Sequence, residues 1–173
     1  HIFNMKKLLL LLLLIPSLAV AEDWNSYCNF MADFHNTFKV SIDKKTGGGL
    51  PIKNYSCNTT QKTLVAKHQL AEKYNNAAKS KKWRKEFDMH ARLRMGRHFC
   101  GLARAQSMSS KEKDIYAAQF FTNQPSALGM KMSATMRQML DVDLSNSFFQ
   151  VIIEDKDGRK LSNFKNSFND CKD

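Results

Sequence analysis

Apolar residues after the first twenty positions recur with the period of an α-helix. One stripe follows steps of four, three, four and three: Trp24, Cys28, Met31, His35 and Phe38. Such spacing places side chains on one face of a helix. The run Lys44 to Pro51 (K-K-T-G-G-G-L-P) interrupts the pattern and predicts a flexible linker loop.

Four further segments predict helices. Thr59 or Thr60 can cap a second helix. Its stripe consists of Leu64, His68, Ala71, Tyr74 and Ala78. A third helix is expected from about Arg84 to Met108.

Ser109 and Glu112 form a capping box that predicts the start of a fourth helix through Phe121. A shorter fifth helix is expected around Met132 to Leu140.

The C-terminal segment has a different pattern. Phe148 to Ile153 is rich in β-forming residues, and Asp157-Gly158 predicts a hairpin turn. A lone hairpin is marginal, so it must pack on the helices or pair with a strand such as Phe38 to Ile42. Phe164 and Phe168 suggest a last helical turn. We therefore predict a mainly α fold: about five helices around one core, a small C-terminal β-hairpin and two disulfides.

The N-terminus predicts export. Lys6 and Lys7 precede an apolar run from Leu8 to Ile15, and Ala19-Val20-Ala21 fits a cleavage site. We interpret residues 1–21 as a signal peptide with upstream residues, cleaved after Ala21. Residues 22–173 are then a single globular domain, periplasmic or secreted.

Four cysteines in an exported chain predict two disulfides. Three pairings are possible. We favour Cys28–Cys57 with Cys100–Cys171, because an oxidant meeting the emerging chain joins consecutive thiols.

Basic residues exceed acidic ones, 27 to 16, for a net charge of +11. On the third helix, one face carries three arginines: Arg94, Arg97 and Arg104. Earlier in the chain, Trp83 lies between the basic residues Lys81, Lys82 and Arg84. Guanidinium rows suit phosphate or carboxylate groups. They predict an anionic lipid headgroup or an acidic protein as partner, with peripheral membrane contact; the alternative is a merely solvated face. Nucleic acid is a less fitting partner for an exported protein.

His35, His68 and His98 lie within apolar stripes. With Met132, Met136 or Met139 they could ligate copper or haem, but methionines at helical spacing usually fill core gaps. We interpret the histidines as structural and expect no metal or cofactor. The sequence lacks G-x-S-x-G, H-E-x-x-H and a Gly-rich phosphate loop, so we assign no catalytic residue.

Part of the third helix resembles a known family. Phe87-Asp88, Ala91-Arg92-Leu93 and Gly96-Arg97-His98-Phe99 resemble the signature of periplasmic phospholipid-shuttle proteins, the Mla-type auxiliary family. Val151 to Glu154 and Leu161 to Phe168 are similar to its final strand and terminal basic-aromatic helix. The resemblance implies an acyl-chain cavity between helices and sheet, with a basic docking surface.

We therefore expect a non-enzymatic exported binding protein for an anionic or amphipathic partner, with a lipid carrier as its more specific form. Candidate residues for an apolar cavity are Phe120, Phe121, Met136, Phe148 and Ile152. One alternative is an inhibitor or immunity-type protein that caps a secreted enzyme, with the Gly47 to Gly49 loop projecting. Another is a secreted enzyme without a recognisable motif.

Overall fold

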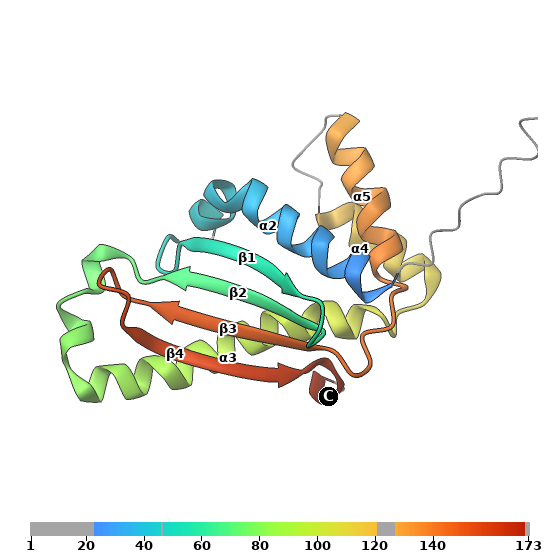
Figure 1. Ribbon diagram of the computed structural model, residues 1–173. Coiled ribbons are helices and arrows are strands. Elements are labelled where there is room, and N and C mark those ends of the chain that lie inside the picture. The colour runs from blue at the N-terminus through green and yellow to red at the C-terminus, as the bar shows by residue number, and fades with distance from the viewer. Residues whose placement is uncertain (1–22, 46, 121–126, 172–173) are drawn as a thin grey trace, which may run out of the picture.

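The computed structural model describes residues 23–45, 47–120 and 127–171 (Figure 1). The helices are α2 (Trp24–Lys45), α3 (Lys81–Ala105), α4 (Ser110–Phe120) and α5 (Ala127–Met139). The strands are β1 (Ile52–Asn58), β2 (Thr63–Gln69), β3 (Phe148–Glu154) and β4 (Lys160–Ser167). Short 3-10 turns are η1 (Glu72–Tyr74), η2 (Ala77–Lys79) and η3 (Phe168–Cys171).

The four strands form one mixed sheet in the order β1-β2-β3-β4. Two antiparallel hairpins, β1–β2 and β3–β4, meet where β2 pairs parallel to β3. Parallel neighbours need a long crossover, which α3, α4 and α5 supply here. The predicted mainly α fold is therefore wrong: the C-terminal hairpin is one half of a four-stranded sheet, β2 of the other half lies where a helix was expected, and β1 was not predicted. Its partner strand is β2, not residues 38–42.

The segment that follows residue 58 forms strand β2 instead of the expected second helix. A step of four, as between Leu64 and His68, fits both a helix face and a strand face. In the structure Leu64, Ala66 and His68 are buried and alternate with the less buried Val65. The carboxamide Oδ1 of Asn58 accepts the Gln61 N–H at 3.0 Å, so a local turn occupies the place of the expected helix cap.

Other predicted elements are confirmed. The α2 helix covers the first stripe, and α3 begins after Ser80, whose hydroxyl accepts the Trp83 N–H. Ser109 and Glu112 form the expected reciprocal capping box at the start of α4. The β3–β4 hairpin turns at Gly158, whose φ of +77° suits glycine. Phe164, expected in a helical turn, lies in β4.

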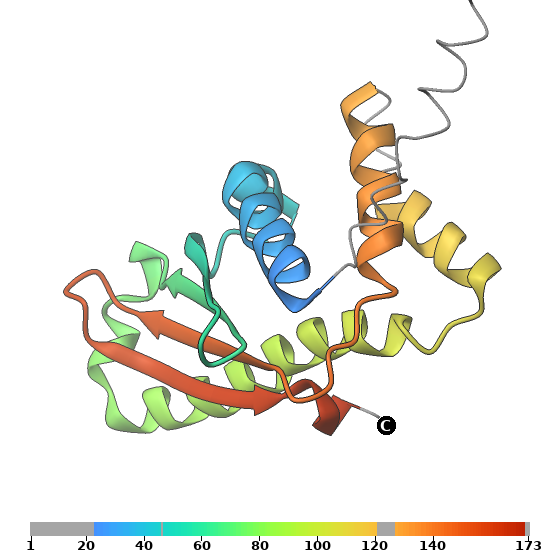
Figure 2. The same cartoon turned by 45° about the vertical axis from the view of Figure 1, so that its right-hand side comes forward.

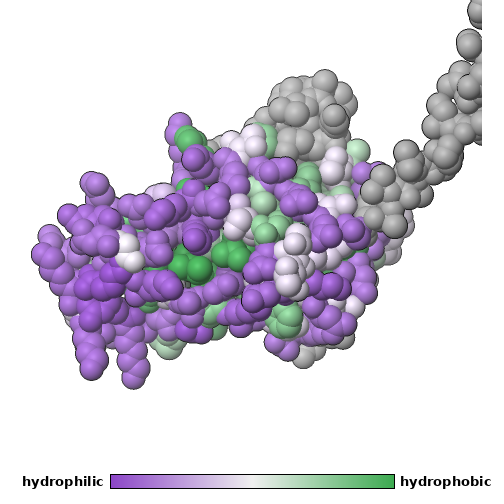
Figure 3. Space-filling view, in the orientation of Figure 1, coloured by the Kyte–Doolittle hydropathy of each residue, from purple (hydrophilic) through white to green (hydrophobic). Residues whose placement is uncertain are grey.

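One face of the sheet is covered by helices. Figure 1 shows α3 passing behind the strands, with α2 alongside β1. The alternate residues Phe149, Val151 and Ile153 of β3 are fully buried on the helix side. The other face is more exposed, and Figure 3 shows a small apolar area there within hydrophilic surface. In Figure 2, α4 and α5 stand beyond the strands, at the end of α3.

Helix side chains cover backbone groups along both outer edges of the sheet. Asn36 of α2 donates to the Tyr55 carbonyl and accepts the Tyr55 N–H, each at 2.8 Å. Asp43 Oδ1 accepts the Ile52 N–H at 3.1 Å. Arg92 of α3 donates to the Asn163 carbonyl of β4 at 3.3 Å. These side chains thus bond to edge backbone groups that could otherwise pair with another strand.

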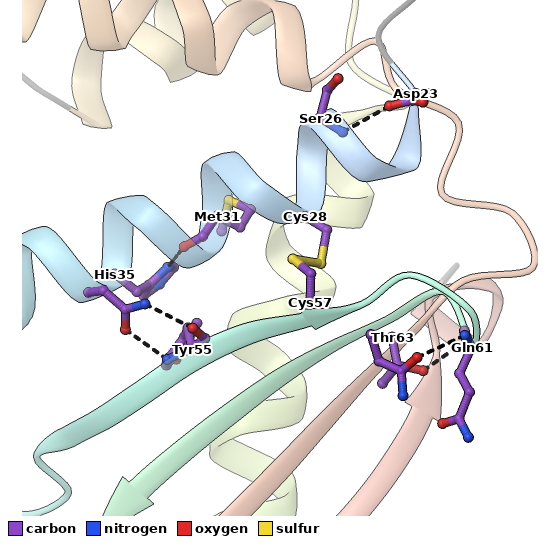
Figure 4. Close-up of a disulfide and its surroundings, with 11 residues drawn as sticks. Asp23, Ser26, Cys28, Met31, His35, Tyr55, Cys57, Gln61 and Thr63 are labelled. Carbon is purple, nitrogen blue, oxygen red and sulfur yellow. Dashed lines mark hydrogen bonds between the residues drawn. A yellow bond between two sulfur atoms is a disulfide. The ribbon is translucent and has the colours of Figure 1, made fainter.

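Two disulfides tie the layers together, and the favoured pairing is confirmed. Cys28–Cys57 joins α2 to β1 (Figure 4), and Cys100–Cys171 joins α3 to η3. Such bridges are consistent with an extracellular or periplasmic protein. None of the helices among the described residues combines the length and the apolar character that crossing a bilayer would require. The predicted signal peptide lies outside the described residues.

Candidate functional site

The predicted basic residues lie along α3 and its N-terminal end. Arg94, Arg97 and Arg104 are all exposed, as are Lys81 and Lys82. Arg84 differs, because its Nη1 donates to the carbonyls of Ala78 and Lys79 at 2.9 Å. Its guanidinium therefore holds the turn before α3.

The same face of α3 exposes apolar side chains. Met89 is 53% exposed and Leu93 is 55% exposed, one turn apart. Leu93 lines a shallow hollow together with His90, Arg94 and Arg97. We call this surface the basic face; it combines positive charge with two unburied apolar side chains.

A cavity of about 150 Å³ lies between the end of α2, the glycine loop, β1, β2 and α3. We call it the histidine cavity. It is lined by His35, Ile42, Asp43, Gly49, Leu50, Ile52, Tyr55, His68, Arg94, Met95 and His98.

Hydrogen bonds fix the buried imidazoles of this cavity. His35 Nδ1 donates to the Met31 carbonyl at 2.7 Å, and its ring stacks on Tyr55 with centroids 4.2 Å apart (Figure 4). His68 Nδ1 donates to the Leu50 carbonyl at 3.0 Å, which leaves Nε2 to accept from the Tyr55 hydroxyl at 3.2 Å. Both rings are therefore held in one tautomer.

Burial keeps these groups uncharged. Desolvation lowers the pKa of His35 to about 4, against the opposing hydrogen bond to Met31. Desolvation also lowers the pKa of His68 and raises that of Tyr55. Neutral imidazoles and a neutral phenol therefore line the cavity at neutral pH.

His98 completes the histidine group at the rim. His98 as a whole is exposed, but its imidazole ring packs edge-on against the ring of His35, with centroids 5.9 Å apart. Desolvation of that packed ring lowers its pKa. Within residues 23–45, 47–120 and 127–171, no three His, Cys, Asp or Glu side chains are grouped to hold a metal ion. Met136 is buried in the core, and the side chain of Met132 lies outside the described part.

A second cavity, of about 220 Å³, adjoins the first. We call it the aromatic cavity. It is lined by Gly49, Leu50, Leu70, Tyr74, Trp83, Phe87, His90, Ala91 and Arg94. The rings of Trp83 and Phe87 stack with centroids 4.9 Å apart and planes at 14°. Gly49, Leu50 and Arg94 belong to both cavities.

The glycine loop has a role that the sequence did not reveal. The Gly48 N–H donates to the Asp43 carbonyl at 2.8 Å, which helps to end α2. The Gly49 carbonyl accepts the Ala71 N–H at 3.2 Å. The loop expected to be a flexible linker is thus a wall shared by two cavities. Its only sequence signal is the glycine run itself.

The residues predicted to line an apolar cavity lie in different places. Met136 is in the main core. Phe148 and Ile152 alternate with buried residues of β3 and lie on the more exposed sheet face. Phe120 ends α4 with its side chain outside the described part, and Phe121 lies outside the described residues. The two cavities above are formed by other residues.

Comparisons with known proteins were negative. No family model, no curated protein and no solved structure matches this chain. The basic face and the two cavities are therefore the features of the molecule that bear on its function.

Proposed function

We propose that this chain is an exported, non-enzymatic binding protein whose basic face docks on an anionic lipid surface. The observation that carries the proposal is the exposed pair Met89 and Leu93 within a helix of strong positive charge. Lipid headgroups supply the negative charge, and the layer beneath them accepts apolar side chains.

Charge along α3 supports an anionic partner. The helix carries eight Lys or Arg residues against two acidic ones, Glu86 and Asp88. Asp88 is already paired with Arg92 at 2.8 Å. Within the described part of the chain, neither Arg94 nor Arg97 has a hydrogen-bond or ion-pair partner. Their guanidinium groups are therefore available to phosphate oxygens.

The apolar pair argues for a lipid surface over an acidic protein surface in solution. Exposed side chains of this size gain free energy only when they leave water. Export to the periplasm after cleavage at Ala21 is part of the proposal, and the two disulfides support it. Carriage of a lipid, which the family resemblance implies, is the more specific proposal and needs its own test by native mass spectrometry.

The test is co-sedimentation with vesicles of phosphatidylglycerol and phosphatidylcholine, compared with phosphatidylcholine alone. We expect binding only to the anionic vesicles, weakening as salt rises because screening shortens the reach of charge. Arg97→Glu should weaken binding and flatten its salt dependence. Leu93→Gln should weaken binding with the salt dependence retained.

Lys111→Glu is the matched control, because Lys111 is exposed on α4 rather than on the basic face. It changes the net charge as Arg97→Glu does and should bind nearly as well as wild type. Equal losses in both charge variants would show a response to total charge alone. That result, or wild-type protein that ignores anionic vesicles, contradicts the proposal.

A further inference from the structure

We infer that the aromatic cavity and the adjoining Arg94 form a binding site for a small aromatic anion. The ring system lies in the aromatic cavity, and its carboxylate or sulfonate meets Arg94 where the two cavities join. The site shares Arg94 with the basic face, but its binding of a soluble aromatic anion does not depend on lipid docking.

The aromatic cavity suits a planar apolar ring. Trp83 and Phe87 are only partly buried, they stack nearly parallel, and both line the cavity, so part of its wall is aromatic. Leu70, which is 2% exposed, and Ala91 supply an apolar floor. Aromatic rings gain from offset or edge contacts with such walls beyond the area they bury.

Arg94 supplies the charge that such a ligand needs. It lines both cavities, yet it pairs with no other residue in the described part of the chain. By contrast, Arg84 and Arg92 on the same helix are bonded to protein groups. A guanidinium beside apolar walls binds a carboxylate or sulfonate through charge-assisted hydrogen bonds.

The histidine cavity determines which way the ligand lies. Asp43 lies in its wall and engages the Ile52 N–H, so its carboxylate repels an anion placed there. The anionic group therefore stays at Arg94. A part of the ligand that extends past Leu50 meets neutral imidazoles, which add no positive charge for the anionic group, and both ring nitrogens of His68 are already bonded.

Gly49 provides a way to block the site. Its φ is not in the left-handed region, and a Cβ there would meet only Tyr74 Cε2, at an ordinary 3.8 Å. A larger side chain therefore fits the backbone and grows into the space that both cavities share. Gly49→Leu should fill the site without straining the loop.

The experiment uses two probes that differ mainly in charge. Anilinonaphthalene sulfonate is an aromatic anion, and phenylnaphthylamine is its uncharged relative. Both fluoresce more strongly in apolar surroundings, and titration into the disulfide-intact protein gives affinity and stoichiometry. We expect one molecule of the sulfonate to bind per chain.

Arg94→Gln should weaken sulfonate binding on the order of tenfold to a hundredfold and leave phenylnaphthylamine nearly unchanged. Arg97→Gln is the matched control, because Arg97 lies one turn further along α3 and lines neither cavity. This variant should bind both probes as wild type does. Gly49→Leu should lose both probes. Circular dichroism and thermal unfolding show that each variant is folded.

Four results would overturn the inference. One is sulfonate binding that survives Arg94→Gln. Another is an equal loss in Arg97→Gln, which would place the probe on the basic face. The third is binding of several probe molecules per chain. The fourth is full binding by a folded Gly49→Leu variant. Vesicle binding is tested with Arg97→Glu and Leu93→Gln, at residues that line neither cavity, so the two proposals fail independently.

Discussion

His35 illustrates how one residue combines packing with a pH-dependent free energy. Its side chain is 2% exposed, between the Met31 carbonyl and the Tyr55 ring. Its place on an apolar stripe was visible in the sequence. That it meets Tyr55, His68 and His98 around one cavity was not, because those residues come from three other elements.

The depressed pKa of His35 predicts loss of stability in mild acid. The unfolded chain takes up a proton near pH 6.5, whereas the folded chain resists it down to about pH 4. The stabilisation is therefore complete above pH 6.5 and is lost as the pH falls from 6.5 to 4, by up to about 3 kcal/mol. Burial also lowers the pKa of His68, so its protonation lowers the free energy of unfolding in mild acid as well.

Urea unfolding at several pH values between 7.5 and 4.5 measures this dependence. His35→Phe removes the titrating group, so its free energy of unfolding should fall less steeply with pH, whatever its absolute stability. Equal slopes in wild type and His35→Phe would contradict the prediction.

At the scale of elements, α2 acts as the cover of the β1 edge. Asn36→Ala removes both hydrogen bonds to Tyr55, and we expect a loss of roughly 1–3 kcal/mol in the free energy of unfolding. Denaturant unfolding measures it. Thr37→Ala, at the exposed neighbour on α2, is the control and should change stability little. An Asn36→Ala variant as stable as wild type would show that water replaces the side chain without cost.

In contrast to Asn36, the exposed arginines of α3 should contribute little to stability. Replacing Arg94, Arg97 and Arg104 together by alanine should leave the thermal midpoint nearly unchanged, because all three are exposed. Differential scanning calorimetry measures the midpoint. The same variant should bind anionic vesicles more weakly. A strongly lowered midpoint would mean that the row carries structural contacts that outweigh its exposure.

Element prediction succeeded where the signal was local. The α2 stripe, the Ser109–Glu112 capping box and the Asp157-Gly158 turn each depend on residues a few positions apart. It failed at β2, because a four-residue step is shared by helix and strand. The neighbouring strand decides between them, through backbone bonds that a local pattern does not contain.

For the whole molecule, the disulfides are the main covalent constraint. They close segments of 29 and 71 residues. Replacing Cys100 and Cys171 together by serine should cost about 2–5 kcal/mol, slightly more than replacing Cys28 and Cys57, because the longer loop restrains the unfolded chain more. Urea unfolding compares the two double variants.

Intact mass after alkylation, with and without reduction, checks the bridges themselves. All four thiols should be protected in the folded protein and reactive after reduction. A thiol that alkylates without reduction would contradict the bridges and reopen a reactive or metal-bound cysteine.

The sequence alone determined the helices with strong periodicity, the C-terminal hairpin, the two disulfides and the basic character of α3. Each depends on neighbouring residues or on composition. Only the tertiary structure decided that two distant hairpins join through a parallel β2–β3 pair and that helices cover one sheet face. It also decided that Arg94 lines one cavity with Trp83 and another with the buried histidines, with Gly49 in the wall of both. Such contacts bring together residues far apart in the chain, and their free energy appears only once the whole core has formed.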